Sequence, residues 1–117
     1  MQLTMTPPTE ITNETMWSAA EHNIAQNAFE TAYTREIEAL MIDVRKQCTS
    51  IDGLAQVWKL NDFLNSKRHE IEGKYDYREP ALVFVFATLL HDGWLSMDDL
   101  CGLDRLKLDK ISALANM

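Results

Sequence analysis

Hydrophobic positions recur every three or four residues along a long segment that no glycine or proline interrupts before Gly53. This pattern is typical of a helix with one apolar side. Ser18 and Glu21, which precede the segment, have the spacing of a capping box, in which each side chain satisfies an amide at the start of a helix. The sequence therefore predicts a helix from Ser18 to Thr49, then a turn, with Asp52 as the cap of the next helix. The apolar positions of the first helix are Phe29, Tyr33, Ile37, Leu40, Val44 and Cys48.

A second segment repeats with alternating steps of three and four residues, the pattern of a heptad seam. Its seam positions are Leu54, Val57, Asn61, Leu64, Arg68, Ile71 and Tyr75. Glu70 and Lys74 predict an exposed ion pair one turn apart. Gly73 and the Tyr-Asp-Tyr-Arg run after it predict the end of this helix. Two polar residues on the seam, Asn61 and Arg68, need a separate explanation.

The last third of the chain predicts shorter helices. Pro80 suits the first turn of a helix over Ala81–His91, and Gly93 stands where a C-terminal glycine belongs. The valines and phenylalanines of this run also suit a strand, but its length and its two flanking signals favour a helix. Ser96–Asp99 predicts the start of a short helix, and Leu103–Ala115 predicts the last one.

These lengths predict the shape of the molecule. A helix over residues 18–49 extends roughly 48 Å, and one over residues 53–76 roughly 36 Å. A compact chain of this size is only about 35 Å across, so the short C-terminal helices leave apolar faces uncovered. We predict an all-α fold with two long antiparallel stalk helices (about 18–77) and a small C-terminal helical head (about 79–117). Residues 15–117 form one domain after a flexible tail at 1–14, and a homodimer covers the stalks.

Charge and composition exclude several classes of protein. The net charge of −7 opposes binding to nucleic acid or anionic lipid. Residues 89–103 could pass for a helix-turn-helix, but Asp98 and Asp99 would face the phosphates of DNA. The two cysteines, Cys48 and Cys101, are far apart, which favours reduced thiols in the cytoplasm. No signal peptide is predicted, and the longest apolar run is too short to span a bilayer.

The sequence lacks the residue patterns of common active sites. None of His22, His69 and His91 has glutamate three positions before it, and the second histidine of a zinc-protease HExxH motif is absent. The four glycines are scattered, so no phosphate-binding loop is predicted. We expect no catalytic residue, no metal site and no cofactor.

The polar seam leaves two interpretations open. Arg68 with Glu72, and Asp62 with Lys59, could be solvated pairs on the surface of one helix, each contributing a few tenths of a kcal/mol. Alternatively, Arg68 pairs with Asp62 of a second chain, as polar seam residues do when they fix the register of a coiled coil. The second interpretation explains better why a guanidinium stands on an apolar seam, because an unpaired buried charge costs several kcal/mol.

The stretch WKLNDFLNSKRHEIEGKYDYR, residues 58–78, resembles the signature region of the cyanobacterial fluorescence recovery protein family. That family has tryptophan-lysine-leucine, DFL, KRHEI and GKYD in this order. The likeness continues through Trp17-Ser18, residues 33–36, residues 83–87 and residues 108–114. It thus covers nearly the whole chain from Trp17 onward.

This resemblance implies an all-helical homodimer without enzymatic activity. It implies binding to the light-activated red form of the orange carotenoid protein, chiefly through that protein's C-terminal domain, and a faster return to the orange form. The return detaches the quencher from phycobilisomes and restores antenna fluorescence, near the cytoplasmic face of thylakoids. By motif match, Trp58, Asp62 and Arg68 form the dimer and partner cluster, and Phe84 and Lys110 are partner-binding positions of the head.

One position of this cluster departs from the family pattern. The family often has a histidine where this chain has Asn61. Asparagine keeps hydrogen-bonding capacity but takes no proton near neutral pH. Asn61 therefore supports one alternative: a helical dimeric interaction protein of the same fold with a different protein client.

Overall fold

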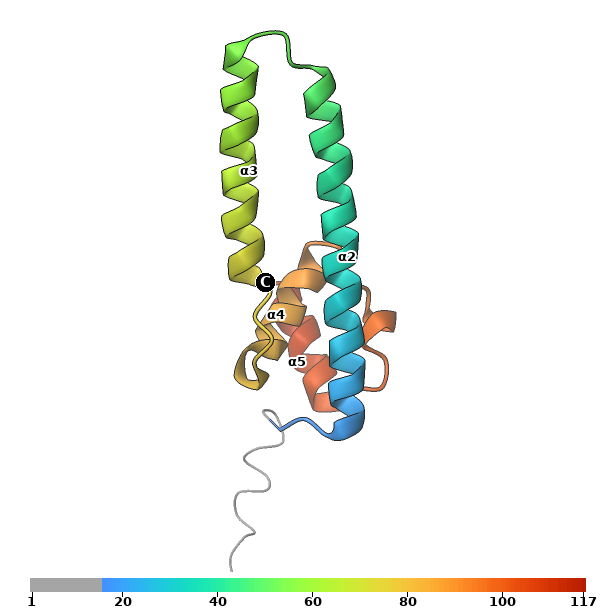
Figure 1. The fold of residues 1–117 in the computed structure, drawn as a ribbon. Helices are drawn as coiled ribbons and strands as arrows, with labels where there is room; N and C mark the ends of the chain where they lie inside the picture. The colour runs from blue at the N-terminus through green and yellow to red at the C-terminus, as the bar shows by residue number, and fades with distance from the viewer. Residues whose placement is uncertain (1–15) are drawn as a thin grey trace, which may run out of the picture.

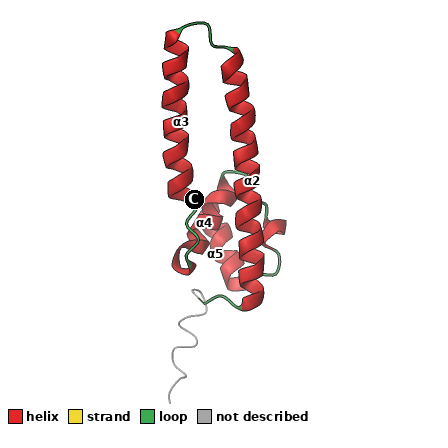
Figure 2. Ribbon diagram, viewed as in Figure 1, coloured by secondary structure: helices red, strands yellow, loops and turns green. Residues whose placement is uncertain are grey.

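The computed structural model describes residues 16–117, and this part of the chain is helical without a strand (Figure 2). The predicted all-α class, with its two-helix stalk and its C-terminal head, is confirmed. The predicted tail at 1–14 lies outside the described residues. The elements in chain order are α2 (Ala19–Thr49), α3 (Leu54–Lys74), α4 (Glu79–His91), the 3₁₀ helix η1 (Met97–Leu100) and α5 (Arg105–Ala115).

The two long helices run antiparallel and extend away from the short ones (Figure 1). The predicted capping box starts α2: the backbone amide of Glu21 donates to Ser18 Oγ, and Glu21 Oε1 accepts from the backbone amide of Ser18, both at 3.1 Å. The predicted cap of the second helix is wrong. Gly53, not Asp52, precedes α3, and no side chain caps its first amides.

The C-terminal elements follow the predicted order. The ambiguous apolar run is a helix, α4, and Pro80 lies in its first turn. Gly93 follows it with a φ of 87°, a left-handed conformation that favours glycine. The last helix begins two residues later than predicted. Asp104 caps α5 by accepting a hydrogen bond from the amide of Leu106 at 2.9 Å, which leaves Leu103 in the preceding loop.

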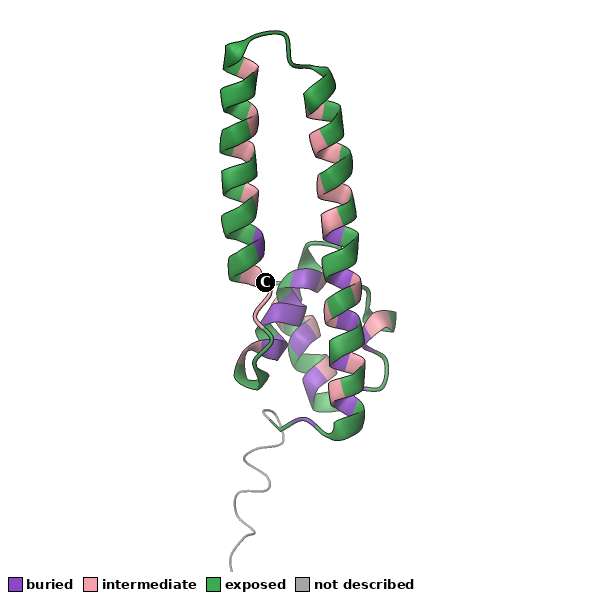
Figure 3. Cartoon of the chain, viewed as in Figure 1, coloured by how far each residue is buried: buried purple, intermediate pink, exposed green. Residues whose placement is uncertain are grey.

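The hydrophobic core lies in the head, and the first half of α2 belongs to it. Ala25, Ala28 and Ala32 of α2 are buried there, and their small side chains let the other helices approach closely. The largest fully buried side chains are Leu82, Phe86, Leu89, Leu100 and Ile111. The stalk has almost no buried residue, as Figure 3 shows by its exposed colouring. Only the second half of α2 therefore projects with α3 beyond the head.

An ion pair holds the loop around η1 against α2. Arg35 Nη1 donates to the carbonyl oxygen of Trp94 at 3.0 Å and to Asp99 Oδ2 at 2.9 Å. The hydrogen bond from Arg35, together with the amide of Ser96, lowers the pKa of the Asp99 carboxyl. Over residues 16–117, no helix combines the length and hydropathy that a membrane span requires.

Candidate functional site

The predicted seam of α3 lies on an exposed face of the single chain. The side of α3 that faces α2 is instead formed by residues that are at least half-buried, Leu60, Phe63, Lys67 and Ile71. At about 100° per residue, the seam positions are turned by roughly a quarter of the helix circumference from that side. Asn61 and Arg68 are therefore exposed in one chain, and the seam meets the intrachain contact only at its lower end, Ile71 and Tyr75.

The apolar stripe of α2 is turned toward the same side of the stalk. Because α2 and α3 run antiparallel, residues displaced in the same rotational sense from their mutual contact emerge on one side. The two helices together form what we call the stalk face: Tyr33, Ile37 and Val44 of α2 with Val57, Asn61, Leu64 and Arg68 of α3. Tyr33, Val57 and Leu64 are large apolar residues that remain exposed on it.

Trp58 and Asp62 lie beside the stalk face, on the side of α3 away from α2. Trp58 is 58% exposed, a high value for a tryptophan. Asp62 lies one turn after it on the same side of the helix. The structure thus places Trp58, Asn61, Asp62 and Arg68 on one exposed stretch of α3.

Arg68 forms a solvated pair within the chain. Its Nε donates to Glu72 Oε2 at 3.2 Å, one turn further along α3, and its side chain is 73% exposed. Arg68 and Asp62 are separated by about 9 Å along the helix axis and by about a third of its circumference. A pair between these two residues therefore requires two chains, as the second interpretation of the seam holds.

The head position Phe84 borders a hollow, and the head position Lys110 lies one helical turn before a residue that lines it. Phe84 projects from α4 with 58% of its surface exposed. It borders a hollow of about 320 Å³, and Leu114 of α5, one turn after Lys110, lines the same hollow. His91, which also lines the hollow, ties the ends of α4 and α5 together, because its Nδ1 lies 2.9 Å from the carbonyl oxygen of Ala115. The complete lining is Phe84, Ala87, Thr88, His91, Leu114 and Met117.

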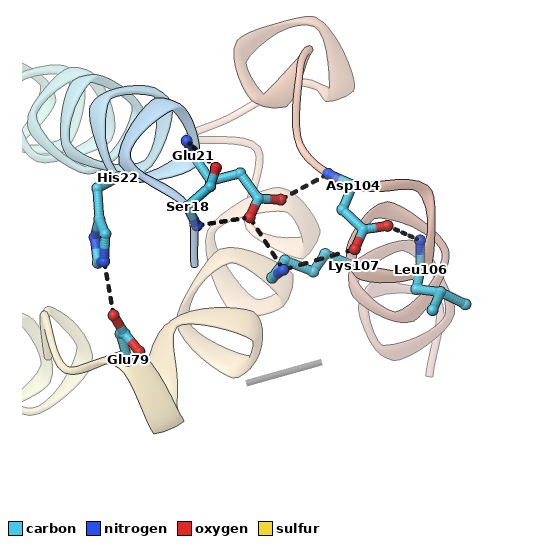
Figure 4. Close-up of polar contacts among 7 residues, drawn as sticks. All are labelled: Ser18, Glu21, His22, Glu79, Asp104, Leu106 and Lys107. Atoms are coloured by element: carbon cyan, nitrogen blue, oxygen red, sulfur yellow. Dashed lines mark hydrogen bonds and ion pairs between the residues drawn. The ribbon is translucent and has the colours of Figure 1, made fainter. Parts of the chain in front are cut away.

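A buried ion pair that the sequence analysis did not predict joins α5 to the start of α2 (Figure 4). Lys107 of α5 is 2% exposed, and its Nζ lies 3.2 Å from Glu21 Oε1 and 5.2 Å from the Trp17 ring. Glu21 Oε2 also accepts a hydrogen bond from the amide of Asp104 at 2.8 Å. Burial acts to raise the pKa of Glu21, but the hydrogen bonds from Asp104, Ser18 and Lys107 outweigh it and lower the pKa.

A second polar contact joins the starts of α2 and α4. His22 Nε2 lies 2.7 Å from Glu79 Oε2 (Figure 4), and the Tyr77 hydroxyl donates to the carbonyl oxygen of His22 at 3.4 Å. These groups fasten the connection between α3 and α4 to the start of α2. Across residues 16–117 no group of three or more histidine, cysteine or acidic side chains is arranged to hold a metal ion.

A third cluster contains the predicted pair of Glu70 and Lys74, which forms at 3.6 Å, but its lysine side chain is buried rather than exposed. The Lys74 side chain is only 7% exposed, and its Nζ lies 2.9 Å from Glu36 Oε2 of α2. Glu36 Oε1 accepts a second hydrogen bond, from the Tyr75 hydroxyl at 2.8 Å. Burial, reinforced by Glu36, raises the pKa of Tyr75. The sequence offered one signal: Glu36 follows Ala25, Ala28 and Ala32 at helical spacing, which places it on the buried side of α2.

Comparisons with known proteins identify the family. A family model described as photoprotection regulator fluorescence recovery protein matches residues 17–115. The chain belongs to this family. A fluorescence recovery protein of Synechocystis sp. is 44% identical over 106 residues, covering 91% of this chain and 97% of the relative.

Solved structures of fluorescence recovery proteins share the fold. The structure from Fremyella diplosiphon is 54% identical with a TM-score of 0.85, and that from Synechocystis sp. PCC 6803 is 44% identical with a TM-score of 0.84. Each match covers 87% of this chain and 100% of the solved one. The likeness therefore includes both stalk and head, and this chain is a photoprotection regulator of the fluorescence recovery protein family.

Proposed function

We propose that this chain binds the light-activated red form of the orange carotenoid protein, mainly at that protein's C-terminal domain, and accelerates its reversion to the orange form. Reversion detaches the carotenoid protein from phycobilisomes and restores antenna fluorescence. The observation that carries the proposal is family membership over residues 17–115. The exposed positions Trp58, Arg68 and Phe84 supply surfaces for a protein partner.

We propose further that the working form is a homodimer joined through the stalk face. Tyr33, Val57 and Leu64 are exposed on the stalk face, and the stalk as a whole has almost no buried residue. Large apolar side chains that are exposed on one face of a helix pair support an interaction site at that face. A second copy related by a two-fold axis presents the same face, so that one chain covers the other. The same axis allows Arg68 of each chain to meet Asp62 of the other.

The proposed mechanism requires no covalent chemistry. Accelerating a conformational return requires tighter binding to the transition state between the red and orange forms than to the red form. A rigid helical scaffold that contacts both separated domains of the carotenoid protein holds them near each other and lowers the entropy cost of their re-docking. The net charge of −7 favours a partner surface with basic patches.

The test is optical. An orange carotenoid protein is illuminated, and the loss of red absorbance in the dark is followed with and without this chain. The expected result is faster reversion that saturates with the concentration of the added chain. Quenched phycobilisomes treated in the same way regain fluorescence sooner. Equal dark rates with and without the chain contradict the proposal.

Asn61 favours a second candidate function. A helical dimer with the same stalk and head could serve a different protein client, and Asn61 lies exposed within the α3 cluster where the family often has histidine. Returning this residue to histidine, Asn61→His, discriminates between the two functions. If the client is the orange carotenoid protein, both proteins accelerate reversion, whereas a changed client predicts that only the Asn61→His protein does so.

A further inference from the structure

The two proposed partner surfaces lie on helices that scarcely pack against each other. The α3 cluster consists of Trp58, Asn61, Asp62 and Arg68, whereas Phe84 is on α4. An open hollow of about 410 Å³ separates the base of α3 from α4. Its lining is Glu70, Gly73, Lys74, Asp76, Ala81, Phe84, Val85 and Thr88. Hydrophobic packing alone therefore does not fix the position of α3 relative to α4.

Lys74, the last residue of α3, connects the elements around this hollow. Its Nζ lies 2.9 Å from Glu36 of α2, 3.6 Å from Glu70 of α3 and 3.7 Å from Asp92 at the C-terminal cap of α4. One ammonium thus contacts three carboxylates from three helical elements. The side chain is 7% exposed, so solvent screens its ionic contact with Glu36 far less than it would a surface pair.

Tyr75 strengthens the same connection. Its hydroxyl donates to the second carboxylate oxygen of Glu36, and its ring packs edge-on against Phe29 and Tyr33 of α2. Glu36 is therefore satisfied from two sides by consecutive residues at the end of α3. This arrangement fixes the direction in which the chain leaves α3, because hydrogen bonds to a buried carboxylate tolerate little misalignment.

We propose that Lys74 is a positioning residue that holds the α3 cluster at a fixed place relative to the Phe84 surface of α4. This inference rests on the proposed function, in which one scaffold contacts two separated partner domains. The entropy advantage of such a scaffold depends on its rigidity, since displacing an aligned group by about 1 Å can cost on the order of 10²-fold in rate. If the base of α3 is loosened, the α3 cluster and the Phe84 surface can each still bind the carotenoid protein. The two domains of that protein are then no longer held in a fixed relative position.

The experiment separates affinity from acceleration. Lys74→Met is compared with the unaltered protein over a range of concentrations in the dark-reversion assay. The expected result is a maximal acceleration reduced about tenfold, with the half-saturating concentration changed less than about twofold, because positioning acts on the transition state more than on ground-state binding. A weaker half-saturation with the full maximal acceleration overturns the proposal, since it makes Lys74 a simple contact residue.

One further variant guards against a folding defect. Lys74→Met leaves the Glu36 charge buried without its ammonium partner, which is destabilising. In the double variant Glu36→Gln/Lys74→Met neutral side chains replace the buried pair, the remaining carboxylates of Glu70 and Asp92 are accessible to solvent, and the glutamine can still accept from Tyr75. We expect this double variant to recover thermal stability but not maximal acceleration. Recovery of both overturns the proposal.

Lys67→Met is the matched control, because it removes a lysine of the same helix whose contacts, with Glu70 at 3.7 Å and with the Phe63 ring at 6.0 Å, lie within α3. It should leave the maximal acceleration unchanged.

Backbone hydrogen exchange gives a readout that is independent of the carotenoid protein. Amides of residues 74–79 should exchange faster in Lys74→Met and in the double variant than in the unaltered protein, while those of α5 should not change. If the unaltered protein accelerates no reversion, the proposed function fails, and the exchange result still decides whether Lys74 holds α3. Unchanged exchange at residues 74–79 overturns the positioning role on its own.

Discussion

A buried charged residue in the head is stabilised by the ion-pair and hydrogen-bond partners that surround it. Lys107 is nearly inaccessible to solvent, and its ammonium pairs with the Glu21 carboxylate. The same carboxylate accepts hydrogen bonds from two backbone amides. A buried charge with such partners is tolerated, whereas removal of one partner leaves the other uncompensated. The Glu21 cluster therefore ties the start of α2 to the start of α5 as a unit.

The Glu21 cluster predicts a defined pH dependence of stability. The pKa of Glu21 is lower in the folded protein, so its contribution to the free energy of unfolding is present above the unfolded pKa and is lost as the pH falls through the folded pKa. We expect Glu21→Gln to reduce the free energy of unfolding by about 1–3 kcal/mol at pH 7. Denaturant unfolding at several pH values should show this difference shrinking below about pH 4.5.

Glu38→Gln is the control, since Glu38 lies on the same helix and is exposed. A difference between Glu21→Gln and the unaltered protein that stays constant down to pH 3 would contradict the role assigned to Glu21.

Arg68 gives a prediction that separates its two interpretations. Among residues 16–117 of one chain it forms an exposed pair with Glu72, which contributes about 0.3–0.5 kcal/mol. If it also meets Asp62 of a second chain, Arg68→Leu should leave helicity intact and weaken or rearrange the dimer. Circular dichroism and sedimentation velocity test the two parts of this expectation. Arg105→Leu removes an arginine with a similar exposed pair, to Asp109, and should change neither. An unchanged sedimentation profile for Arg68→Leu favours the solvated pair.

At the scale of helices and their connections, two glycines predict opposite effects of the same substitution. Gly102 has a φ of 106°, and a Cβ atom there would lie 2.5 Å from Ile24 Cδ1. Gly102→Ala should therefore lower the free energy of unfolding by about 1–3 kcal/mol. Gly73 lies within α3, and a Cβ atom there meets nothing within 4 Å. Gly73→Ala should raise the free energy of unfolding by about 0.5–1 kcal/mol. Thermal unfolding of both variants checks the two signs, and destabilisation by Gly73→Ala would contradict the helical reading of that position.

The order and type of the helices could be predicted from the sequence because local signals set them. The Ser18–Glu21 capping box, Pro80 and Gly93 each act within one turn of the helix they bound. Lys74 could not be predicted in the same way, because its burial depends on Glu36, which is distant in sequence and comes from another helix. The local i,i+4 spacing to Glu70 correctly predicted the pair of Glu70 and Lys74, but tertiary packing buries its lysine side chain, which the spacing could not show.

The candidate site likewise combines features that the sequence predicts with features that only the tertiary structure shows. Trp58, Arg68 and Phe84 were named from motif and resemblance, and their exposure follows from which side of α3 and α4 packs inward. The seam pattern alone could not show whether α2 or a second chain covers it, because both solutions place apolar residues at the same spacing. Only the structure shows that Leu60 and Phe63 are the half-buried side of α3, which leaves the stalk face uncovered.

For the whole molecule, the exposed apolar side chains of the stalk predict which face a second copy covers. Leu64 lies on the stalk face, whereas Ile42 of α2 is also exposed but lies nine residues after Tyr33, half a helix turn round from it. Leu64→Glu should dissociate the proposed homodimer, because burying an unpaired carboxylate at an interface costs several kcal/mol. Ile42→Glu, an equal change on the opposite side of α2, should leave the dimer intact.

Sedimentation equilibrium of the two proteins decides between the faces of the stalk. The expected outcome is a monomer for Leu64→Glu and the unaltered mass for Ile42→Glu. The reverse pattern would place the interface on the other side of α2 and separate Arg68 from any second-chain Asp62. If both substitutions gave monomers, the two copies would wrap around the whole stalk. If the unaltered protein were a monomer, the proposal that a second copy covers the stalk face would be wrong.

The side of the stalk that binds a second chain also decides which side of α3 remains open to the carotenoid protein. The mass of these two variants therefore constrains how a partner domain can reach Trp58.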